Sequence, residues 1–502
     1  MPREICFDEN LILKAVPSTP EAERQKDSMG KIGFTKIASI VVGFCVASAI
    51  ASSAQTFTRL TKFNGSNGQW PYYGSLIQGT DGNFWGTTSF GGNGSKGGTV
   101  FQITPNGKLI TVCSFGAGGG CPNGSVPYAG LIQDVEGNFY GTTYEGGSQG
   151  FGDVFEITTE GQYVELHSFC SEPNCTDGQS ASQGLIQAMN GKLYGIASGA
   201  IFTLNADNGF TSLFAGEDAP RQMIQASDGN FYGIGVKGSH KGGDVLEITA
   251  SGMGRTMYNF CSESNCADGE QPIALMEGAD GNFYGTTTYG GASNSGVVFK
   301  ITPGGDYSVL YSFCSQANCA DGGGPSAGLV QGTDGNFYGT TTFGGAVKIN
   351  GIFGGYGTVF QITPAGQLTT LHTFCLQGGD CADGAYPFAA LVQGTDGDFY
   401  GTTYGLVNCP GNCGTVFRIS MGLSPFVTAN PNFAPVGHIV NILGSHFTGT
   451  TSVTFHGTSA TYDVVSDTLI KATVPSGATA GSIEVTTPGG TLSSNAPFQV
   501  LP

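Results

Sequence analysis

A short phrase, an aromatic pair followed by glycine at the end of an Asp-Gly-Asn-type turn, occurs seven times along the chain. The copies begin at Asn83, Asn138, Lys192, Asn230, Asn282, Asn336 and Asp398. Their second aromatic residues are spaced by 55, 54, 38, 52, 54 and 62 residues. A sequence period of about 50 residues is typical of propellers and solenoids. The repeat therefore restricts the fold before any single residue is considered.

Each repeat contains four strand-like segments in a constant order. The first is apolar and ends in Gln or Glu, as in GLIQ from Gly130, and the second is the aromatic-glycine phrase. The third resembles VFQI from Val100, and the fourth resembles TTLHTF from Thr369. Short strands separated by Gly, Pro, Asn and Asp indicate antiparallel meanders. Four strands in each of seven repeats predict a seven-bladed β-propeller.

The two ends of the repeat region are out of phase in a way that favours ring closure. The segment TFTRLTKF from Thr56 matches a fourth strand, whereas VFRIS from Val416 matches a third strand. The N-terminal strand is therefore expected to complete the last blade and to remove an open sheet edge. A solenoid would not need this phase shift. The predicted propeller spans residues 55–420.

The composition changes at both ends of this region. Residues 425–502 lack cysteine, are rich in Val, Thr, Gly and Ser, and predict a small immunoglobulin-like β-sandwich. Residues 29–54 contain two lysines, an apolar run from Ile37 to Ile50 and small residues before Gln55. This order predicts a signal peptide, so residues 1–28 are interpreted as an upstream extension or a misplaced start. An uncleaved anchor would need about 20 apolar residues. Export to the medium or the cell surface is expected, with no membrane-spanning segment after cleavage.

The twelve cysteines after the leader fall into six close pairs. They are Cys113 and Cys121, Cys170 and Cys175, Cys261 and Cys266, Cys314 and Cys319, Cys375 and Cys381, and Cys409 and Cys413. Zinc needs four converging ligands, whereas these pairs recur on separate repeats without a fixed histidine. Local disulfides in an oxidising compartment are the favoured interpretation.

The strand order assigns all cysteine pairs and the long glycine-rich loops to one face of the propeller. The Asp-Gly turns lie on the opposite face, which is short and uniform. Because binding sites concentrate on loops held by a rigid scaffold, the cysteine-bearing face is the predicted working surface. The third repeat is shortened around residues 195–199, which creates either a notch in this face or a degenerate repeat without a role.

Two resemblances to known families extend these predictions. The segments GLVQGTDGNFYGTT from Gly328 and GTVFQITPAG from Gly357 resemble the GloVer tandem repeat of bacterial exported proteins, and the likeness covers residues 56–420. It implies a β-propeller on an exported, often surface-anchored protein with no established reaction. The segment from Pro425 to Val500 resembles an IPT/TIG domain. That resemblance implies spacing, docking or contact with a partner, and it supplies no catalytic residues.

The charge and motif content exclude several classes of function. The net charge of −18 with only 19 Lys and Arg residues argues against nucleic-acid binding, which needs a basic face. No P-loop, Rossmann fingerprint, HExxH or GxSxG motif in a suitable setting is present. His167 and His372 occupy fourth-strand positions and are predicted to be packing residues. No catalytic residue and no cofactor are predicted.

Two sets of aspartates recur with the repeat. The first set precedes glycine in the first turn, where Asp hydrogen-bonds its own backbone: Asp81, Asp228, Asp280, Asp334 and Asp396. The second set follows the second cysteine of a pair: Asp177, Asp268, Asp321 and Asp383. These four are weak calcium candidates, since calcium prefers oxygen ligands. Turn formation is favoured for them, because the copies lie on different blades.

Two classes of function remain open. The favoured one is an exported, monomeric, non-catalytic binding or scaffold protein that contacts a ligand, a glycan or a protein partner through the cysteine-rich loops. The alternative is a propeller-type polysaccharide lyase or glycoside hydrolase. An enzyme would place blade-specific acid and base groups at the axis, whereas the charged residues here follow the repeat. The identity of the ligand stays open.

Overall fold

The structure of the chain is a computed structural model that describes residues 55–502 except 94–96, 117, 199, 206–208, 216–219, 236–237, 239–240, 250–253, 346–347, 350–351, 377–380 and 406–412. The predicted extension and signal peptide lie outside the described residues. Residues 55–502 form one compact unit. Within the described part of the chain, no helix has the length and apolar character needed to cross a membrane.

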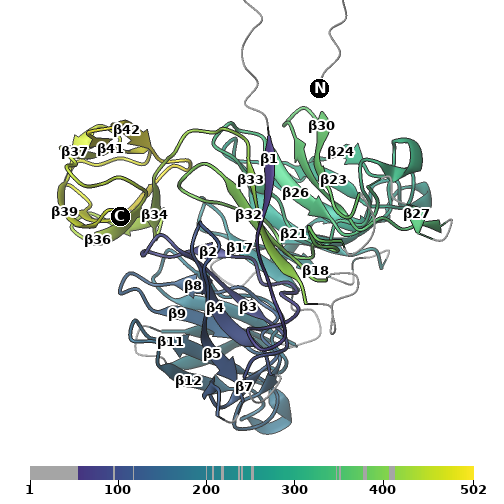
Figure 1. Cartoon of the computed structure of the whole chain (residues 1–502), viewed down its shortest axis with the longest axis horizontal. Coiled ribbons are helices and arrows are strands. Elements are labelled where there is room, and N and C mark those ends of the chain that lie inside the picture. The colour runs from purple at the N-terminus through teal and green to yellow at the C-terminus, as the bar shows by residue number, and fades with distance from the viewer. Residues whose placement is uncertain are drawn as a thin grey trace, which may run out of the picture. The chain divides into compact units, whose positions relative to one another are not determined.

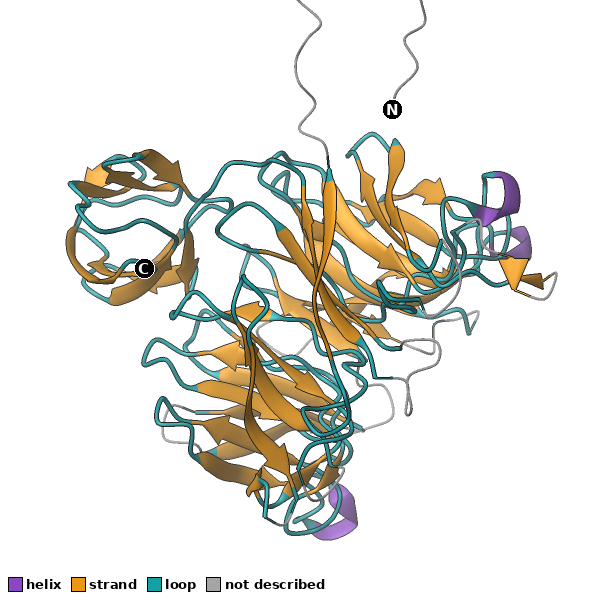
Figure 2. Ribbon diagram, in the orientation of Figure 1, coloured by secondary structure: helices purple, strands orange, loops and turns teal. Residues whose placement is uncertain are grey.

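The described fold is all-β, as predicted, and Figures 1 and 2 show its strands gathered into many small sheets. Seven sheets, here numbered sheet 1 to sheet 7 along the chain, occupy the repeat region, and all their strand pairs are antiparallel except the parallel pair β5 and β6 of sheet 1. Sheet 1 consists of β2 (Ile77–Gln78), β3 (Phe84–Thr88), β4 (Thr99–Ile103), β5 (Leu109–Phe115) and β6 (Gly120–Cys121). Sheet 2 consists of β8 (Ile132–Gln133), β9 (Phe139–Thr142), β11 (Asp153–Ile157) and β12 (Tyr163–Ser168). Sheet 3 consists of β13 (Ile186–Gln187), β14 (Leu193–Ala197), β15 (Ala200–Leu204) and β16 (Phe210–Ala215).

Sheets 4 to 6 repeat the same order of strands. Sheet 4 consists of β17 (Gln222–Gln225), β18 (Phe231–Gly235), β19 (Asp244–Ile248) and β20 (Gly254–Asn259). Sheet 5 consists of β21 (Glu270–Glu277), β22 (Phe283–Tyr289), β23 (Val297–Ile301) and β24 (Tyr307–Ser312). Sheet 6 consists of β25 (Val330–Gln331), β26 (Phe337–Thr341), β29 (Thr358–Ile362) and β30 (Leu368–Thr373). Two short ribbons lie outside the seven sheets: β7 (Gly124–Ser125) with β10 (Glu145–Gly146), and β27 (Lys348–Ile349) with β28 (Ile352–Phe353).

Sheet 7 combines both ends of the repeat region. It contains β31 (Val392–Gln393), β32 (Phe399–Thr403), β33 (Thr415–Ser420) and the N-terminal strand β1 (Thr56–Lys62). Strand β1 pairs antiparallel with β33, and Thr56 lies opposite Ser420. Figure 1 shows β1 alongside β33 and β32. The predicted partnership of the first strand with the last repeat is therefore present.

The aromatic-glycine phrase joins each sheet to the next. Its second aromatic ring contacts the first aromatic ring of the following copy, as in Tyr338 and Phe399 with centroids 3.9 Å apart. The same contact joins sheet 7 to sheet 1, where Tyr400 stacks on Phe84 at 3.9 Å. Six such pairs are present. Sheet 3 carries Leu193 in place of the first aromatic, which explains why the junction of sheets 2 and 3 has no such ring pair. The phrase is a packing element, as the sequence indicates.

A second link runs in parallel with these ring contacts. The Gln or Glu that ends the first strand of one sheet accepts a hydrogen bond from a backbone N–H in the turn between the first two strands of the preceding sheet. The six donors and acceptors are Thr80 and Gln133, Met189 and Gln225, Ser227 and Glu277, Ala279 and Gln331, Thr333 and Gln393, and Thr395 and Gln78. The last pair again connects sheet 7 to sheet 1. Because each N–H is a turn donor that needs a partner, these bonds fix the spacing of the sheets.

The C-terminal residues form two four-stranded sheets and one short parallel ribbon. The first sheet contains β34 (Thr428–Asn430), β36 (Ile439–Leu443), β40 (Leu469–Thr473) and β39 (Thr461–Ser466). The second contains β38 (Thr458–Ser459), β37 (Ser452–Phe455), β41 (Ile483–Thr487) and β42 (Gly490–Ser493). The ribbon pairs β35 (Phe433–Pro435) with β43 (Gln499–Leu501). Both four-stranded sheets contribute to one apolar core that contains Ile470 and Val485.

This C-terminal part is hydrogen-bonded to the turns between the first two strands of sheets 1 and 2. The side-chain amide of the buried Asn441 donates to the carbonyl of Val135 at 2.9 Å, and the hydroxyl of Thr468 donates to the carbonyl of Thr80 at 3.2 Å. Part of the turn face is therefore covered by the chain itself. The cysteine-bearing loops lie at the opposite ends of the same strands.

Candidate functional site

The cysteine-bearing loops are closed by disulfides between sequence neighbours. The structure joins Cys113 to Cys121, Cys170 to Cys175, Cys261 to Cys266, Cys314 to Cys319, and Cys375 to Cys381. Three of these loops contain a short 3₁₀ turn: η2 (Pro173–Cys175), η3 (Ser264–Cys266) and η4 (Ala317–Cys319). Cys409 lies outside the described residues, so the sixth predicted pair stays a prediction.

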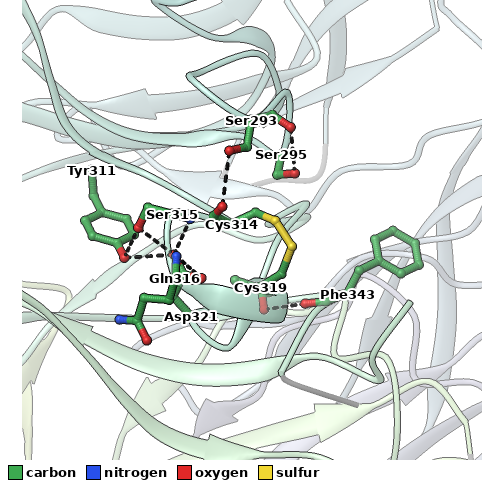
Figure 3. The surroundings of a disulfide bond; sticks show 10 residues. Ser293, Ser295, Tyr311, Cys314, Ser315, Gln316, Cys319, Asp321 and Phe343 are labelled. Atoms are coloured by element: carbon green, nitrogen blue, oxygen red, sulfur yellow. Dashed lines mark hydrogen bonds between the residues drawn. A yellow bond between two sulfur atoms is a disulfide. The ribbon is translucent and has the colours of Figure 1, made fainter. Parts of the chain in front are cut away.

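The aspartate that follows each of these turns holds its loop from the inside. Asp321 is fully buried, and Figure 3 shows it beside the Cys314–Cys319 disulfide. Its carboxylate accepts hydrogen bonds from the backbone N–H and hydroxyl of Ser315, each at 2.9 Å, and from the hydroxyl of Tyr311 at 2.8 Å. These bonds satisfy a carboxylate that would otherwise be costly to bury. Asp321 therefore has a structural role in its loop.

The histidines of the fourth strands occupy the position of Tyr311 and make the same contact. His167 lies 3.0 Å from the carboxylate of Asp177, and His372 lies 2.9 Å from that of Asp383. His167 also stacks on Phe210 with centroids 3.5 Å apart. Burial holds the pKa of His167 below its usual value. The packing predicted for these histidines is present, and the hydrogen bond to the loop aspartate is an additional role that the sequence did not show.

The calcium candidates are already engaged by the chain. Hydrogen bonds from Ser171 lower the pKa of Asp177, although burial of its carboxylate acts in the opposite direction. The pKa of Asp268 is lowered in the same way, by Ser262 and Tyr258 against the effect of burial. Among the described residues, no group of three or more His, Cys, Asp or Glu side chains converges as metal ligands would. The four candidates are held in separate loops and are not brought together.

A cavity of about 990 Å³, here called the central cavity, is lined by residues from all seven repeats. Most of these residues lie at the start of first strands or in the segments that precede them, such as Ser182 and Gln183 before β13. Those strand ends are on the side of the cysteine-bearing loops. Ala197 and Ser198, from the shortened hairpin of sheet 3, also line the cavity.

One side of the central cavity is aromatic. Tyr73, Tyr144 and Phe388 line it, and Tyr72 packs behind Tyr73 and Phe388 with centroid distances of 4.1 and 4.8 Å. Further contacts continue this group through Tyr128 and Tyr404. We call these six residues the aromatic wall. The wall comes from repeats 1, 2 and 7. Repeat 7 lies beside repeat 1 because the N-terminal strand β1 pairs with β33 of sheet 7.

The other side of the central cavity comes from repeats 3 to 6, and its described lining residues are aliphatic or polar, with no aromatic side chain. Ser182 and Ser326 lie there, with Ile273 of sheet 5 and Arg221 of sheet 4. Arg221 is the only charged side chain among the described lining residues, and no described carboxylate forms an ion pair with it. Glu145, which contributes to a raised pKa of Tyr128, is not part of the lining.

Tyr73, one of the two tyrosines that line the cavity, is not poised to act as a base. Burial and the hydrogen bond with Tyr72 raise the pKa of Tyr73 well above its usual range, and the charge of Arg221 opposes this rise. A general base at neutral pH needs a pKa near the working pH. The aromatic wall offers flat apolar surface to the cavity, and Arg221 offers a positive charge.

Sequence reasoning did not single out the aromatic wall or Arg221. The signal was present in the residues before the first strand, which read WPYYG from Trp70, VPYAG from Val126 and YPFAA from Tyr386. The corresponding segments are SASQG from Ser180 and GPSAG from Gly324, without an aromatic residue. The repeats thus differ in the segment before the first strand, and this segment supplies Tyr73, Phe388, Ser182 and Ser326 to the lining of the cavity.

Comparisons with known proteins agree with this architecture. The model of the Gloeobacter/Verrucomicrobia repeat matches residues 43–201 and 197–417, and that of the IPT/TIG domain matches residues 426–500. A search of curated proteins gave no match.

Among solved structures, a catalytically inactive virginiamycin B lyase from Staphylococcus aureus with quinupristin is 13% identical, with a TM-score of 0.49, and the match covers 73% of this chain and 99% of that one. The extracellular domain of a protein described as a hybrid two-component system from B. thetaiotaomicron is 12% identical, with a TM-score of 0.47, over 86% of this chain and 53% of that one. Neither likeness informs the activity of this chain.

Proposed function

Because the chain belongs to the Gloeobacter/Verrucomicrobia repeat family and ends in an IPT/TIG domain, we propose that it is an exported, non-catalytic binding protein. In this proposal the seven sheets are the blades of a closed propeller, and the ligand occupies the central cavity from the side of the cysteine-bearing loops. Residues 29–54 are removed as a signal peptide, so that the mature chain begins at Gln55.

The observation that carries the proposal is the asymmetry of the central cavity. The six residues of the aromatic wall, three of which line the cavity, gather on one side of it, whereas the described lining on the other side has no aromatic side chain. Tyr73 is 41% exposed, although an aromatic ring that is exposed to water does not stabilise the fold. Clefts lined by aromatic side chains and a few convergent polar groups are typical ligand sites. The fold of a repeat does not require these aromatic residues, since the other blades form the same sheets without them.

The opposite face is less suited to this role. Its turns are short, and each turn aspartate is occupied, as where Asp334 accepts from the hydroxyl of Tyr338 at 2.8 Å. The C-terminal part is hydrogen-bonded to two of these turns. We infer that the IPT/TIG domain occupies the turn face and leaves the cysteine-bearing face for the ligand.

The alternative, a polysaccharide lyase or glycoside hydrolase, is less well supported. Both reactions need a proton acceptor, and glycoside hydrolysis normally uses two carboxyl groups. The described lining residues include no carboxylate and no imidazole. A polysaccharide-degradation screen that released new reducing or unsaturated ends would establish the enzyme and end the non-catalytic proposal.

The ligand site is tested by a glycan array with the mature protein and two variants. We expect Tyr73→Ala to weaken binding to every bound glycan by about tenfold or more, because an aromatic contact surface is lost. Tyr289→Ala is the matched control, since Tyr289 is 45% exposed and lies outside the cavity. Binding that survives Tyr73→Ala, or that Tyr289→Ala reduces equally, would contradict the proposed site.

Ring closure is tested by comparing two glutamines that make the same bond at different junctions. Gln78 accepts from Thr395 between sheets 7 and 1, and Gln331 accepts from Ala279 between sheets 5 and 6. In a closed ring, Gln78→Ala and Gln331→Ala should each lower the free energy of unfolding by about 1 kcal/mol, because each substitution leaves a turn N–H without its hydrogen-bond acceptor. Denaturant titration measures both. Each glutamine also donates to a carbonyl of its own turn, Gln78 to Gly82 and Gln331 to Gly335, so an open array would show a clearly smaller loss for Gln78→Ala than for Gln331→Ala.

A further inference from the structure

The two sides of the central cavity differ in a way that defines the chemistry of the ligand. On the premise of the proposed function, that the central cavity is the ligand site, we propose that it binds an acidic saccharide. A sugar ring packs on Tyr73 and Phe388, and a carboxylate of the saccharide pairs with Arg221.

The aromatic wall supplies flat surfaces of the right kind for a sugar ring. A pyranose presents a face of C–H groups, which packs on an aromatic ring, and a rim of hydroxyl groups. Tyr73 and Phe388 lie with their centroids 5.9 Å apart in an edge-to-face arrangement, so the two rings form an angled surface. Tyr72 contacts both rings from behind. A rigid aromatic surface binds with little loss of side-chain freedom.

The polar lining complements the rim of hydroxyl groups. Ser182, Gln183 and Ser326 face the same cavity from sheets 3 and 6. Serine hydroxyls donate and accept hydrogen bonds, and glutamine amides offer two donors and an acceptor. A purely apolar ligand would leave these groups without partners, which costs binding energy. At about 990 Å³, the cavity is at the upper end of the range for ligand sites and is large enough for an oligosaccharide.

Arg221 adds the preference for a negative charge. The whole chain has 37 acidic and 19 basic residues, yet the described lining contains no acid and this single cation. Arg221 and Tyr73 line the same cavity. A guanidinium binds a carboxylate through two parallel hydrogen bonds. One ligand can therefore contact the wall and Arg221 together.

The test uses a matched pair of probes, α-1,4-linked trigalacturonate and α-1,4-linked galactotriose, which differ only in their carboxylates. The chain has two tryptophans, and Trp70 stacks on Tyr404 of the aromatic wall at 5.4 Å. Trp85→Tyr installs the residue that the other six repeats carry at this position and leaves Trp70 as the reporter. Its emission during titration gives the affinity for each probe.

We expect trigalacturonate to bind about tenfold or more tightly than galactotriose, a difference that falls as salt is added. Arg221→Gln should remove this preference and leave the affinity for galactotriose unchanged, whereas Arg221→Lys should retain part of it. Arg255→Gln is the charge-matched control, because Arg255 pairs with Glu247 on β19 and does not line the cavity.

The two proposals fail in different ways. Equal binding of both probes, or a preference that Arg221→Gln does not change, would overturn the acidic saccharide and leave the cavity as the ligand site. Binding of both probes that Tyr73→Ala does not weaken would overturn the site itself. If neither probe binds while a neutral glycan or a protein binds through Tyr73, the acidic saccharide is wrong and the proposed function stands.

Discussion

Replacing Asp268 by alanine is expected to lower the free energy of unfolding by about 3 kcal/mol or more. Asp268 is fully buried, and its carboxylate accepts from the backbone N–H of Ser262 at 2.9 Å, from the Ser262 hydroxyl at 2.7 Å and from the hydroxyl of Tyr258 at 2.8 Å. Each donor left unsatisfied in a buried position costs about 1 to 3 kcal/mol. The change therefore removes the inner support of the Cys261–Cys266 loop.

The pH dependence of this effect follows from the lowered pKa of Asp268. Its hydrogen bonds outweigh the opposing effect of burial and keep the pKa below the usual value. A carboxyl group with a lowered pKa in the folded state stabilises the fold above its unfolded-state pKa of about 4, and it loses this contribution as the pH falls through the folded-state value. The difference between wild type and variant should be largest near neutral pH and should shrink in acid.

Thermal and guanidinium unfolding at several pH values measure this prediction. Asp306→Ala is the control, because Asp306 lies in an exposed turn where surface substitutions change stability by about 0.5 kcal/mol or less. An Asp268→Ala protein as stable as the Asp306→Ala protein would show that the aspartates do not hold their loops. The calcium interpretation would then need a new test.

Replacing Asp153 by asparagine is expected to stabilise the protein at pH 8 by about 3 kcal/mol. Asp153 is fully buried in sheet 2, where Thr143 donates to its carboxylate at 2.6 Å and Tyr163 donates to the other oxygen. Burial raises the pKa of Asp153 from its usual 3.8 to about 6, against the effect of these hydrogen bonds. A tenfold change in the acid dissociation constant between the unfolded and folded states corresponds to about 1.4 kcal/mol. The asparagine keeps the shape and needs no ionisation, and the two hydroxyls can rotate to suit it.

The sign of the pH effect is opposite to that of Asp268. Because the folded state binds the proton of Asp153 more tightly than the unfolded state, stability is lost as the pH rises from about 4 to about 6. The variant should therefore equal the wild type near pH 4 and exceed it progressively up to pH 6, with a constant difference above. Denaturant titrations of both proteins between pH 4 and pH 8 give this curve. A variant that is less stable at pH 8, or a difference independent of pH, would contradict a buried carboxylate with a raised pKa.

The sequence was sufficient for the features that repeat. The seven copies of four strand-like segments predicted the seven sheets, and the out-of-phase ends predicted the pairing of β1 with β33. The turn aspartates and the close cysteine pairs were also visible, because both are local patterns. These features depend on contacts within one repeat or on simple counting.

The contacts between repeats could not be predicted in the same way. Gln78 appeared as the end of a strand, yet its partner Thr395 lies in the last repeat. The aromatic wall could not be predicted because it forms only where repeats 1, 2 and 7 lie side by side. Arg221 could not be singled out because only the folded structure places it in the same cavity as Tyr73. His167 and His372 were interpreted as packing residues from their strand position alone, without their aspartate partners. Each of these needs the three-dimensional arrangement of several sheets.

The most direct measurement is a crystal structure of the mature protein with the glycan that binds it most tightly on the array. The account predicts that the bound sugar lies in the central cavity, with a ring against Tyr73 and Phe388 and with Arg221 within hydrogen-bonding distance. A ligand bound at the Asp-Gly turns, on the outer strands or on the C-terminal domain, with the cavity empty, would contradict it.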